Sequence, residues 1–424
     1  IGTILLIFGT GIFFTIRLKF IQFRHPLKIL KSTLLSKDKD NHNDKSVSKF
    51  QALSTALAAS MGTGNIVGVA SAITIGGAGA IFWMWVSAIF GMATAYAENV
   101  LGVKYKNITP NSRTKGPMLY LEHGLKCKPL AIIFAIACVL ASFGIGNMTQ
   151  ANAISSAANV FHLTPSLAGI ITLILTSIII FRKNNSIAKA TEKIIPAISL
   201  FYIIGAVILL IIFRSKIIGA FSLIFTSAFG INQAIGGITG TILKKAITIG
   251  LQRGIFSNEA GMGSSVLIHT AADCKEPCIM GMWAILEVFI DTILCCTLTA
   301  LVIICSGAYQ NGDEGIAIVI SAFESGFGGF ASVFIAISTI IFAFATLLGW
   351  CYYGEACVKY LSEKAFPTIL YKLFFVAAIY IGAVSNLTLV WELSDTFNVL
   401  MLIPNLIGIL LLSSQIIKCN DDYF

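Results

Sequence analysis

The sequence predicts an all-α polytopic membrane protein with eleven transmembrane helices, ten of which form two inverted repeats of five helices each. Three observations lead to this fold class. Of the 424 residues, 56% are hydrophobic and only 12% are charged, whereas soluble proteins carry about 25% charged residues. The apolar residues are grouped into membrane-length segments. Two of these segments carry similar glycine-rich breaks, Gly62–Asn65 and Gly261–Ser264, which begin 199 residues apart (261 minus 62).

The composition also excludes several classes of protein. The mean hydropathy is +0.86, and the net charge of +9 comes from basic residues between apolar segments. That placement indicates membrane topology and not nucleic-acid binding. The ten cysteines lie mostly within apolar segments, so they act as small hydrophobic residues without a disulfide framework. Cys274 and Cys278 lie near His269, but their spacing and loop position favour ordinary thiols over a zinc site.

The first apolar run, Ile1–Ile16, is shorter than the roughly 20 residues that a spanning helix needs. We therefore expect the numbering to begin partway through a first transmembrane helix. Ten further segments are long enough to cross a bilayer with some tilt: 51–74, 79–103, 130–160, 166–181, 194–213, 242–272, 279–307, 328–353, 368–387 and 396–414. Segment 217–241 is apolar but rich in Gly, Ser, Thr, Asn and Gln, so we expect it to form a helix at the membrane interface.

A shift of 199 residues superimposes the first five of these ten segments on the second five. Phe90 then falls on Phe289, and Gly116 falls on Gly315. Because each half has an odd number of helices, the two halves cross the bilayer in opposite senses, which is the inverted-repeat architecture. The chain is predicted to begin with a truncated transmembrane helix and a cytoplasmic loop (1–49), followed by a first repeat (50–213). A connecting interfacial segment (214–241) leads to a second repeat (242–415), and the chain ends in a cytoplasmic tail (416–424).

Lysine and arginine placement predicts the orientation. Three loops on one predicted side are rich in these residues: 17–49, 104–128 and 182–193. Three turns on the other predicted side contain none: 75–78, 161–165 and 388–395. The positive-inside rule makes the basic side cytoplasmic, which places the C-terminus inside and the N-terminus outside if the opening segment spans. Five basic residues around 214–253 are exceptions: Arg214, Lys216, Lys244, Lys245 and Arg253.

The paired breaks predict the location of a binding site. Glycine weakens a helix, and lipid does not tolerate unpaired backbone groups, so a break survives only inside protein or beside a cavity. Paired breaks in two halves indicate the binding site of a secondary transporter. Freed N–H groups attract a carboxylate, and freed carbonyls with hydroxyl groups suit Na⁺, so the site fits a small zwitterion beside a cation. Close helix packing through small residues is the alternative, and it suits Gly68, Gly76 and Gly77.

Two further polar clusters lie within apolar segments. Gln150 belongs to the cluster Gly144–Asn152, and it can either bond neighbouring helices or orient an amine or a carboxylate. The 199-residue shift places this cluster opposite Ala345–Trp350. There, Thr346 offers a hydroxyl group and Trp350 a large wall, and the two share a helix face because they are four residues apart. A position at the membrane interface is the alternative for Trp350.

Several acidic residues lie within predicted spans, where ionisable groups usually have a function. Glu287 and Asp291 are four residues apart, so they share a face and repel if both are ionised. We favour a structural network for this pair over a proton relay. Glu259 can pair with Arg253 or polarise the cation site. Three other carboxylates lie near the predicted cytoplasmic ends, where we expect them to be solvated or ion-paired: Glu98, Glu122 and Glu355.

Seven motifs along the chain resemble the alanine/glycine:cation symporter family of bacteria and archaea. They are specific, and together they cover nearly the whole chain: Phe50–Ala59, Gly62–Ile66, Phe82–Trp85, Gly116–Met118, Arg253–Gly261, Leu286–Thr292 and Leu348–Trp350. The resemblance implies sodium-coupled symport of alanine or glycine into the cell by alternating access. It also implies the LeuT-like inverted-repeat fold of the amino-acid–polyamine–organocation superfamily, in a multi-pass protein of the cell membrane.

The resemblance further implies the residues of the site. The substrate carboxylate would meet the first break, Gln150 would hold the polar end, and Trp350 with the second break would confine a small side chain. The implied substrate-binding residues are Thr55, Gly62, Thr63, Gly64, Asn65, Gln150, Phe256, Gly261 and Trp350. Thr346, with backbone carbonyls near Ala59 and Gly62, would bind sodium.

Two other functions are alternatives to sodium-coupled symport. A proton-coupled amino-acid transporter would use the same fold, with Glu287 and Asp291 as the proton carrier. An intramembrane enzyme is disfavoured, because His162, His269 and the scattered serines do not form a catalytic arrangement. We therefore expect no enzyme activity and no cofactor besides sodium as coupling ion. The expected partners are a small neutral amino acid, sodium and the lipid bilayer, without nucleic acid, and the protein is expected to be a monomer or weak oligomer.

Overall fold

The computed structural model describes residues 2–34, 48–109, 115–182, 186–230 and 239–424, and every regular element in these ranges is a helix. Seven of these helices are long and apolar enough to cross a membrane. The all-helical membrane fold is therefore confirmed, while the number of eleven transmembrane helices stays a prediction. The interfacial segment expected at 214–241 is described up to residue 230 and again from residue 239, so part of it lies outside the described residues.

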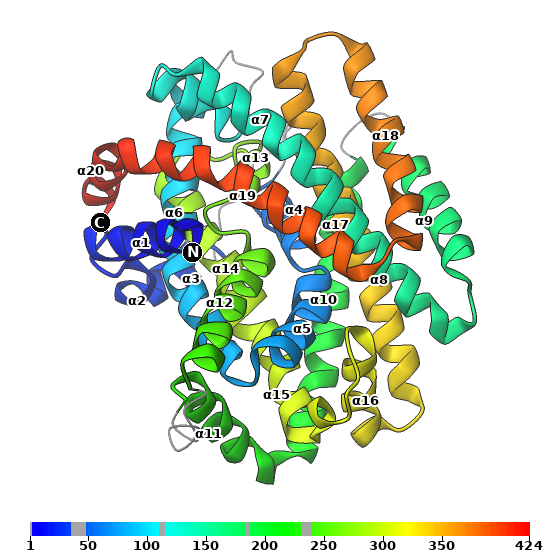
Figure 1. Ribbon diagram of the computed structural model, residues 1–424. Helices are drawn as coiled ribbons and strands as arrows, with labels where there is room; N and C mark the ends of the chain where they lie inside the picture. Colours follow the sequence, from blue (N-terminus) through cyan, green and yellow to red (C-terminus); the bar gives the residue numbers. More distant parts are fainter. Residues whose placement is uncertain (1, 35–47, 110–114, 183–185, 231–238) are drawn as a thin grey trace.

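The first break interrupts a helix pair in the middle of the bundle (Figure 1). α4 (Lys49–Ser60) begins with a capping box, in which the Ser48 side chain accepts from the Gln51 N–H and the Gln51 side chain accepts from the Ser48 N–H. The helix ends where the glycines begin. A single 3-10 turn, η1 (Thr63–Asn65), precedes α5 (Val67–Gly76). The predicted break is thus present as irregular backbone, and all its residues are buried.

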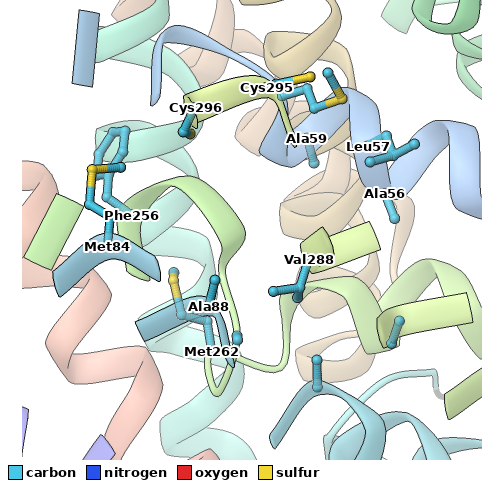
Figure 2. Packing of buried hydrophobic residues seen from close by; sticks show 14 of the residues in the cluster. Ala56, Leu57, Ala59, Met84, Ala88, Phe256, Met262, Val288, Cys295 and Cys296 are labelled. Carbon is cyan, nitrogen blue, oxygen red and sulfur yellow. The ribbon is translucent and has the colours of Figure 1, made fainter. Parts of the chain in front are cut away.

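The second break separates α12 (Thr239–Asn258) from the short α13 (Ser264–His269). Three of its residues have left-handed backbone, with φ of 55° at Glu259, 86° at Gly261 and 74° at Gly263. Glycine adopts this conformation without steric cost, which explains two of the three residue types. Figure 2 shows Met262 on this loop, within the buried apolar cluster that also contains Ala88 of α6 (Gly79–Ile108).

Most of the remaining elements follow the predicted segments, but α19 begins before the predicted span 396–414 and includes the predicted turn 388–395. At the N-terminal end lie α1 (Gly2–Arg17), α2 (Ile21–Arg24) and α3 (Pro26–Ser32). The other helices of the first half are α7 (Lys128–Phe143), α8 (Thr149–Ala158), α9 (Pro165–Ile180), α10 (Ser186–Ile212) and α11 (Ile217–Ala228). Those of the second half are α14 (Pro277–Val288), α15 (Thr297–Ser306), α16 (Ile316–Phe327), α17 (Phe330–Leu361), α18 (Ala365–Val384), α19 (Leu387–Leu411) and α20 (Ser413–Tyr423). Short 3-10 turns are η4 (Asn159–Phe161), η5 (Arg214–Lys216) and η8 (Ala308–Gln310).

Three segments of the structure are π-helical, and two of them, η3 and η7, lie within spans expected to be continuous helices. They are η2 (Tyr120–Gly124), η3 (Gly144–Met148) and η7 (Phe289–Cys296). The predicted spans 130–160 and 279–307 therefore each consist of two α-helices joined by a wider turn. Such turns are rare and often lie at functional sites. Both η3 and η7 lie near the two breaks.

The C-terminal segment, predicted as a cytoplasmic tail at 416–424, is helical. It forms the helix α20, which packs near α1–α3 at one edge of the bundle (Figure 1). The Tyr96 hydroxyl donates to Asn420 Oδ1 at 3.0 Å, and Lys19 Nζ lies 3.0 Å from Asp421 Oδ1. These contacts hold the end of the chain against α6 and the N-terminal region.

The outer surface of the bundle is apolar. Large aliphatic and aromatic side chains are exposed along α9, α10 and α18, including Ile174, Ile178, Ile211, Phe366 and Phe374. An apolar surface this extensive is unusual for a soluble protein and marks contact with lipid. The protein is therefore a multi-pass membrane protein.

Candidate functional site

The first break is held by a glutamine from α8. The Thr63 backbone N–H donates to Gln150 Oε1 at 3.2 Å, and Gln150 Nε2 donates to the Ile145 carbonyl in η3 at 2.9 Å. The wide turn of η3 frees that carbonyl from the ordinary helical pattern. Gln150 thus hydrogen-bonds the backbone of the break, and its role in substrate binding stays a prediction.

Gly62 lies where two other site residues converge. A Cβ atom at this position would collide with Thr346 Oγ1 and would lie 2.9 Å from Gln150 Oε1. Only glycine fits there, because real Cβ atoms do not approach other atoms this closely. Gly62, Thr63, Gln150 and Thr346 therefore form one compact group, drawn from α4, η1, α8 and α17.

Thr346 contacts the end of α4. Its hydroxyl donates to the Ala58 carbonyl at 2.7 Å and to the Phe342 carbonyl of its own helix at 3.1 Å. The sequence analysis expected carbonyls near Ala59 and Gly62, and the structure adds Ala58 to this group. Gly349, one turn further along α17, packs against Ala59, with its ideal Cβ position 3.0 Å from Ala59 Cβ. The last carbonyls of α4 and a threonine hydroxyl thus meet, a donor set suited to a hard cation.

Trp350 is fully buried between η3 and the second break. Its indole N–H donates to Glu259 Oε1 at 2.8 Å, and Glu259 Oε2 accepts from the Ser264 hydroxyl at 2.5 Å. Gly146 of η3 lies directly against the Trp350 side chain, where a Cβ atom would not fit. Trp350 therefore lies inside the bundle and not at a membrane interface.

Of the two roles considered for Glu259, the pairing with Arg253 is not formed. Arg253 Nη1 instead lies 3.7 Å from Asp395 Oδ1 of α19, and its guanidinium is 4.0 Å from the centre of the Trp391 ring. The Phe256 ring, expected in the site, also packs against Trp391 in a tilted arrangement, with 4.4 Å between the ring centres. Arg253 and Phe256 share a face of α12 because they are three residues apart, and this face turns toward α19, away from Glu259.

Asn405 of α19 is a buried residue that the sequence analysis missed. Its Nδ2 donates to the Gly261 carbonyl at 2.8 Å and to Glu98 Oε2 at 2.7 Å, while its Oδ1 accepts from the Tyr120 hydroxyl. Glu98 is fully buried, so the expectation of a solvated or ion-paired group is wrong. The feature of the sequence that could have identified Asn405 is a polar amide side chain inside the apolar segment 396–414. The same feature identified Gln150.

Asn65 turns from the first break toward α14–η7. Its Nδ2 donates to Asp291 Oδ1 at 2.8 Å and to the Asp291 carbonyl at 2.9 Å. The neighbouring Gly64 packs on Ser257 of α12, with its ideal Cβ position 3.1 Å from Ser257 Cα. The two broken helices are therefore in direct contact. Glu287, expected to share a network with Asp291, lies 3.6 Å from His269 Nε2 instead.

Thr55 lies apart from the group at Gly62. It is buried on α4, where its hydroxyl donates to the Gln51 carbonyl at 2.8 Å. Seven residues separate it from Gly62, which is about two helical turns or roughly 10 Å along the helix axis. The structure thus brings Gly62, Thr63, Gln150 and Thr346 together, while Thr55 occupies a different level of the bundle.

A half-open cavity of about 500 Å³ reaches the first break. It extends from Thr63 and Asn152 past Trp391 to Glu314 and Ile316 at the start of α16. The buried Thr63 hydroxyl at its inner end has no hydrogen-bond partner among the described residues. The predicted turn 161–165 follows the lining residues Asn159 and Val160 in sequence, whereas residues 388–395, predicted as a turn, form the first turns of α19 and include the lining residue Trp391. Both segments lack lysine and arginine. The cavity therefore connects the break with the predicted outer side of the membrane.

Known proteins match this chain along almost its full length. The sequence model of the sodium:alanine symporter family matches residues 2–424. The sodium/alanine symporter AgcS of Methanococcus maripaludis is 42% identical, over 98% of this chain and 92% of its own length. The probable sodium/glutamine symporter GlnT of Bacillus subtilis is 38% identical, over 99% of this chain and 87% of its own length. The crystal structure of MhsT in complex with L-phenylalanine is similar in fold, with a TM-score of 0.66, 12% identity and coverage of 89% and 92%.

Proposed function

Since the chain belongs to the sodium:alanine symporter family, we propose that it carries alanine or glycine into the cell together with sodium by alternating access. It is a transporter and not an enzyme. The observation that supports this proposal best is the convergence of Gly62, Thr63, Gln150 and Thr346 at the first break. The Thr63 backbone N–H, an amide and a hydroxyl meet there, and Thr63 also lines the cavity; these are groups that suit a small zwitterion and a cation.

The proposed repeats are residues 50–213 and 242–415, joined by 214–241, in the cell membrane with the C-terminus in the cytoplasm. The cavity between Thr63 and Glu314 would admit the amino acid from outside. Sodium at Thr346 and the carbonyls of Ala58, Ala59 and Gly62 would order the end of α4, which raises the affinity for the amino acid. This coupling is reciprocal by linkage. One group of helices would then rock against the other around the occupied site.

Proteoliposomes test this function directly. We expect uptake of labelled alanine or glycine to rise when an inward sodium gradient is applied, and to fall to background when potassium replaces sodium outside. Uptake that follows a pH gradient and ignores sodium would instead support proton coupling, with Asp291 and Glu287 as the first carriers to examine.

We expect Thr346→Val to weaken sodium binding without changing the fold. Valine keeps the shape of threonine but removes the hydroxyl that contacts the Ala58 carbonyl. The loss of one cation ligand corresponds to about 1.4 kcal/mol, or a tenfold rise in the sodium concentration that gives half-maximal uptake. Thr339→Val on the same helix is the control, because the Thr339 hydroxyl has no hydrogen-bond partner in the described part of the chain. Equal sodium dependence in both variants would remove Thr346 from the ion site.

Trp350→Ala should alter the size of the accepted amino acid. The substitution empties the space beside Gly146 and Glu259, and removal of a buried tryptophan costs about 3–5 kcal/mol of stability. We expect weaker alanine uptake and new competition by valine, measured by inhibition of labelled alanine uptake. Trp350→Phe keeps an aromatic wall and should exclude valine. If Trp350→Ala retains both affinity and selectivity, the ring does not line the pocket.

A further inference from the structure

The segment that follows α1 forms a basic amphipathic surface at one edge of the bundle. Lys19 and Phe20 have left-handed backbone, with φ of 56° and 57°, so the chain turns sharply where α1 ends. The two short helices after this turn, α2 and α3, lie beside α1 and α20 (Figure 1). We call residues 17–34 the basic segment.

One face of the basic segment is buried against the bundle. Leu18, Ile21 and Ile29 are no more than 5% exposed. The Gln22 side-chain amide donates to the Ile89 carbonyl of α6 at 3.2 Å, and α3 packs against α14. These contacts fix the position of the segment on the bundle.

The opposite face of the basic segment is apolar and exposed. Its large side chains recur at alternating steps of three and four residues, and each is at least 40% exposed: Phe20, Phe23, Leu27, Leu30 and Leu34. This spacing is typical of one face of an amphipathic helix. Ile16 at the end of α1 is also exposed, so the face continues the apolar surface of α1 that we expect to contact lipid.

Contacts with α6 indicate the depth of the basic segment in the membrane. α6 begins after the predicted outer turn 75–78. Gln22 bonds Ile89 of this helix, and Lys19 pairs with Asp421 of α20 next to the Asn420 that bonds Tyr96. Ile89 and Tyr96 lie 10 and 17 residues after Gly79 (89 minus 79 and 96 minus 79), or about 15 and 26 Å along the helix axis. Since the hydrocarbon core is about 30 Å thick, the predicted topology places the segment in the cytoplasmic half of the bilayer, where long basic side chains reach the headgroups.

The basic segment is strongly positive. It contains no Asp or Glu, and its five basic residues are Arg17, Lys19, Arg24, Lys28 and Lys31. Two of them are engaged by α20. Lys19 pairs with Asp421, and Lys28 Nζ lies 4.2 Å and 4.0 Å from the centres of the Tyr423 and Phe424 rings. The other three are exposed, and none of them belongs to an ion pair of the described residues.

We propose that the basic segment binds anionic phospholipids of the cytoplasmic leaflet. Arg17, Arg24 and Lys31 contact the phosphate headgroups, and the acyl chains cover the exposed apolar face. Guanidinium groups bind phosphate oxygens in a bidentate manner, and basic clusters beside a membrane span select anionic lipids. A zwitterionic phospholipid offers the same acyl chains without net negative charge, so the segment distinguishes lipids by headgroup charge.

Other occupants fit this surface less well. A soluble anion would leave the apolar face uncovered. A second copy of the chain, in a symmetric contact, would bring the same basic residues together, and like charges across an interface repel. The proposal concerns lipid binding only, so it does not depend on the transported amino acid or the coupling ion.

Native mass spectrometry of the purified full chain, without sodium or amino acid, tests this proposal. The protein is titrated with dioleoyl phosphatidylglycerol or with dioleoyl phosphatidylcholine. We expect wild-type protein to bind phosphatidylglycerol at least tenfold more tightly. Each basic residue near the headgroups contributes about fivefold, so the triple variant Arg17→Gln, Arg24→Gln, Lys31→Gln should lose about 100-fold in affinity for phosphatidylglycerol. Its affinity for phosphatidylcholine should stay as in wild type.

The charge-matched control is the triple variant Arg214→Gln, Lys244→Gln, Lys245→Gln. It removes three exposed basic side chains outside the basic segment and should keep the wild-type preference for phosphatidylglycerol. An equal loss of affinity in both triple variants would assign the effect to net charge and overturn the proposal, as would unchanged affinity in the first variant. If that variant does not fold, Arg24→Gln alone should lose about fivefold, and unchanged affinity overturns the proposal.

Two further outcomes of the same measurement would assign the surface to another occupant. Displacement of phosphatidylglycerol by inorganic phosphate would indicate a site for soluble anions. A dimer mass that disappears in the first triple variant would indicate a contact between copies of the chain. Both results would overturn the proposal and leave the proposed function standing, because sodium-driven uptake tests that function separately.

Discussion

Gly62→Ala should nearly abolish amino-acid uptake in a protein that still folds. The added methyl group would collide with the Thr346 hydroxyl and approach Gln150 Oε1 to 2.9 Å. Both neighbours belong to the group at the first break, so they must move away from the positions that we propose for sodium and the amino acid. Overpacking of this kind costs about 1–3 kcal/mol. Because the displaced groups are those that we propose to bind sodium and the amino acid, we expect uptake to decrease by about 10- to 100-fold.

The measurement is initial uptake in proteoliposomes, with size-exclusion chromatography as the check on folding. Gly68→Ala is the control in the same broken helix. Its ideal Cβ position has only ordinary contacts, 3.7 Å from the Thr63 carbonyl oxygen and 3.9 Å from Trp391. Gly68→Ala should transport normally. Equal activity of the two variants would show that close contact at Gly62 is unimportant for transport.

Asn405→Leu should cause the largest loss of stability. Leucine has the same branched shape and number of side-chain heavy atoms but cannot bond the Gly261 carbonyl, the Glu98 carboxyl group or the Tyr120 hydroxyl. Each buried group left without a partner costs about 1–3 kcal/mol, so the total is several kcal/mol. We expect a lower midpoint of thermal unfolding and a mobile second break, because Asn405 fixes the backbone carbonyl of Gly261.

Thermal unfolding followed by size-exclusion chromatography measures this effect. Asn398→Leu on the same helix is the matched control, because the buried Asn398 Oδ1 has no hydrogen-bond partner among the residues described. The control should be close to wild type in its unfolding midpoint. Similar losses in both variants would mean that any buried asparagine of α19 is sensitive, and that the contacts around Gly261 are not special.

The sequence predicted those parts of the site that depend on local pattern. The density of glycines identified both breaks. The 199-residue shift placed Gln150 and Thr346 in equivalent helices of the two halves. The partner of Glu259 was not predictable in this way. Arg253 was close in sequence, but the backbone from Glu259 to Gly263 turns the carboxylate toward Trp350, which is 91 residues away.

Burial was also difficult to predict near helix ends. Glu98 lies in the second half of α6, where a carboxylate usually reaches water, and its burial depends on α19 covering it more than 300 residues later in the chain. The π-helical turns left no common sequence signal, because Gly144–Met148 and Phe289–Cys296 share no pattern. Both features arise from tertiary packing, which composition and periodicity do not record.

The wide turn η3 has a consequence for how this chain can change in evolution. A π-turn accommodates one residue more than an α-helical turn. Deletion of a single residue from Gly144–Met148 would therefore let α7 continue into α8 as a regular α-helix. α8 would then keep its direction and its facing residues, because the wide turn alone accommodates the extra residue. A change of length in this segment is therefore absorbed locally, and it alters the turn beside Gln150 more than the helices on either side.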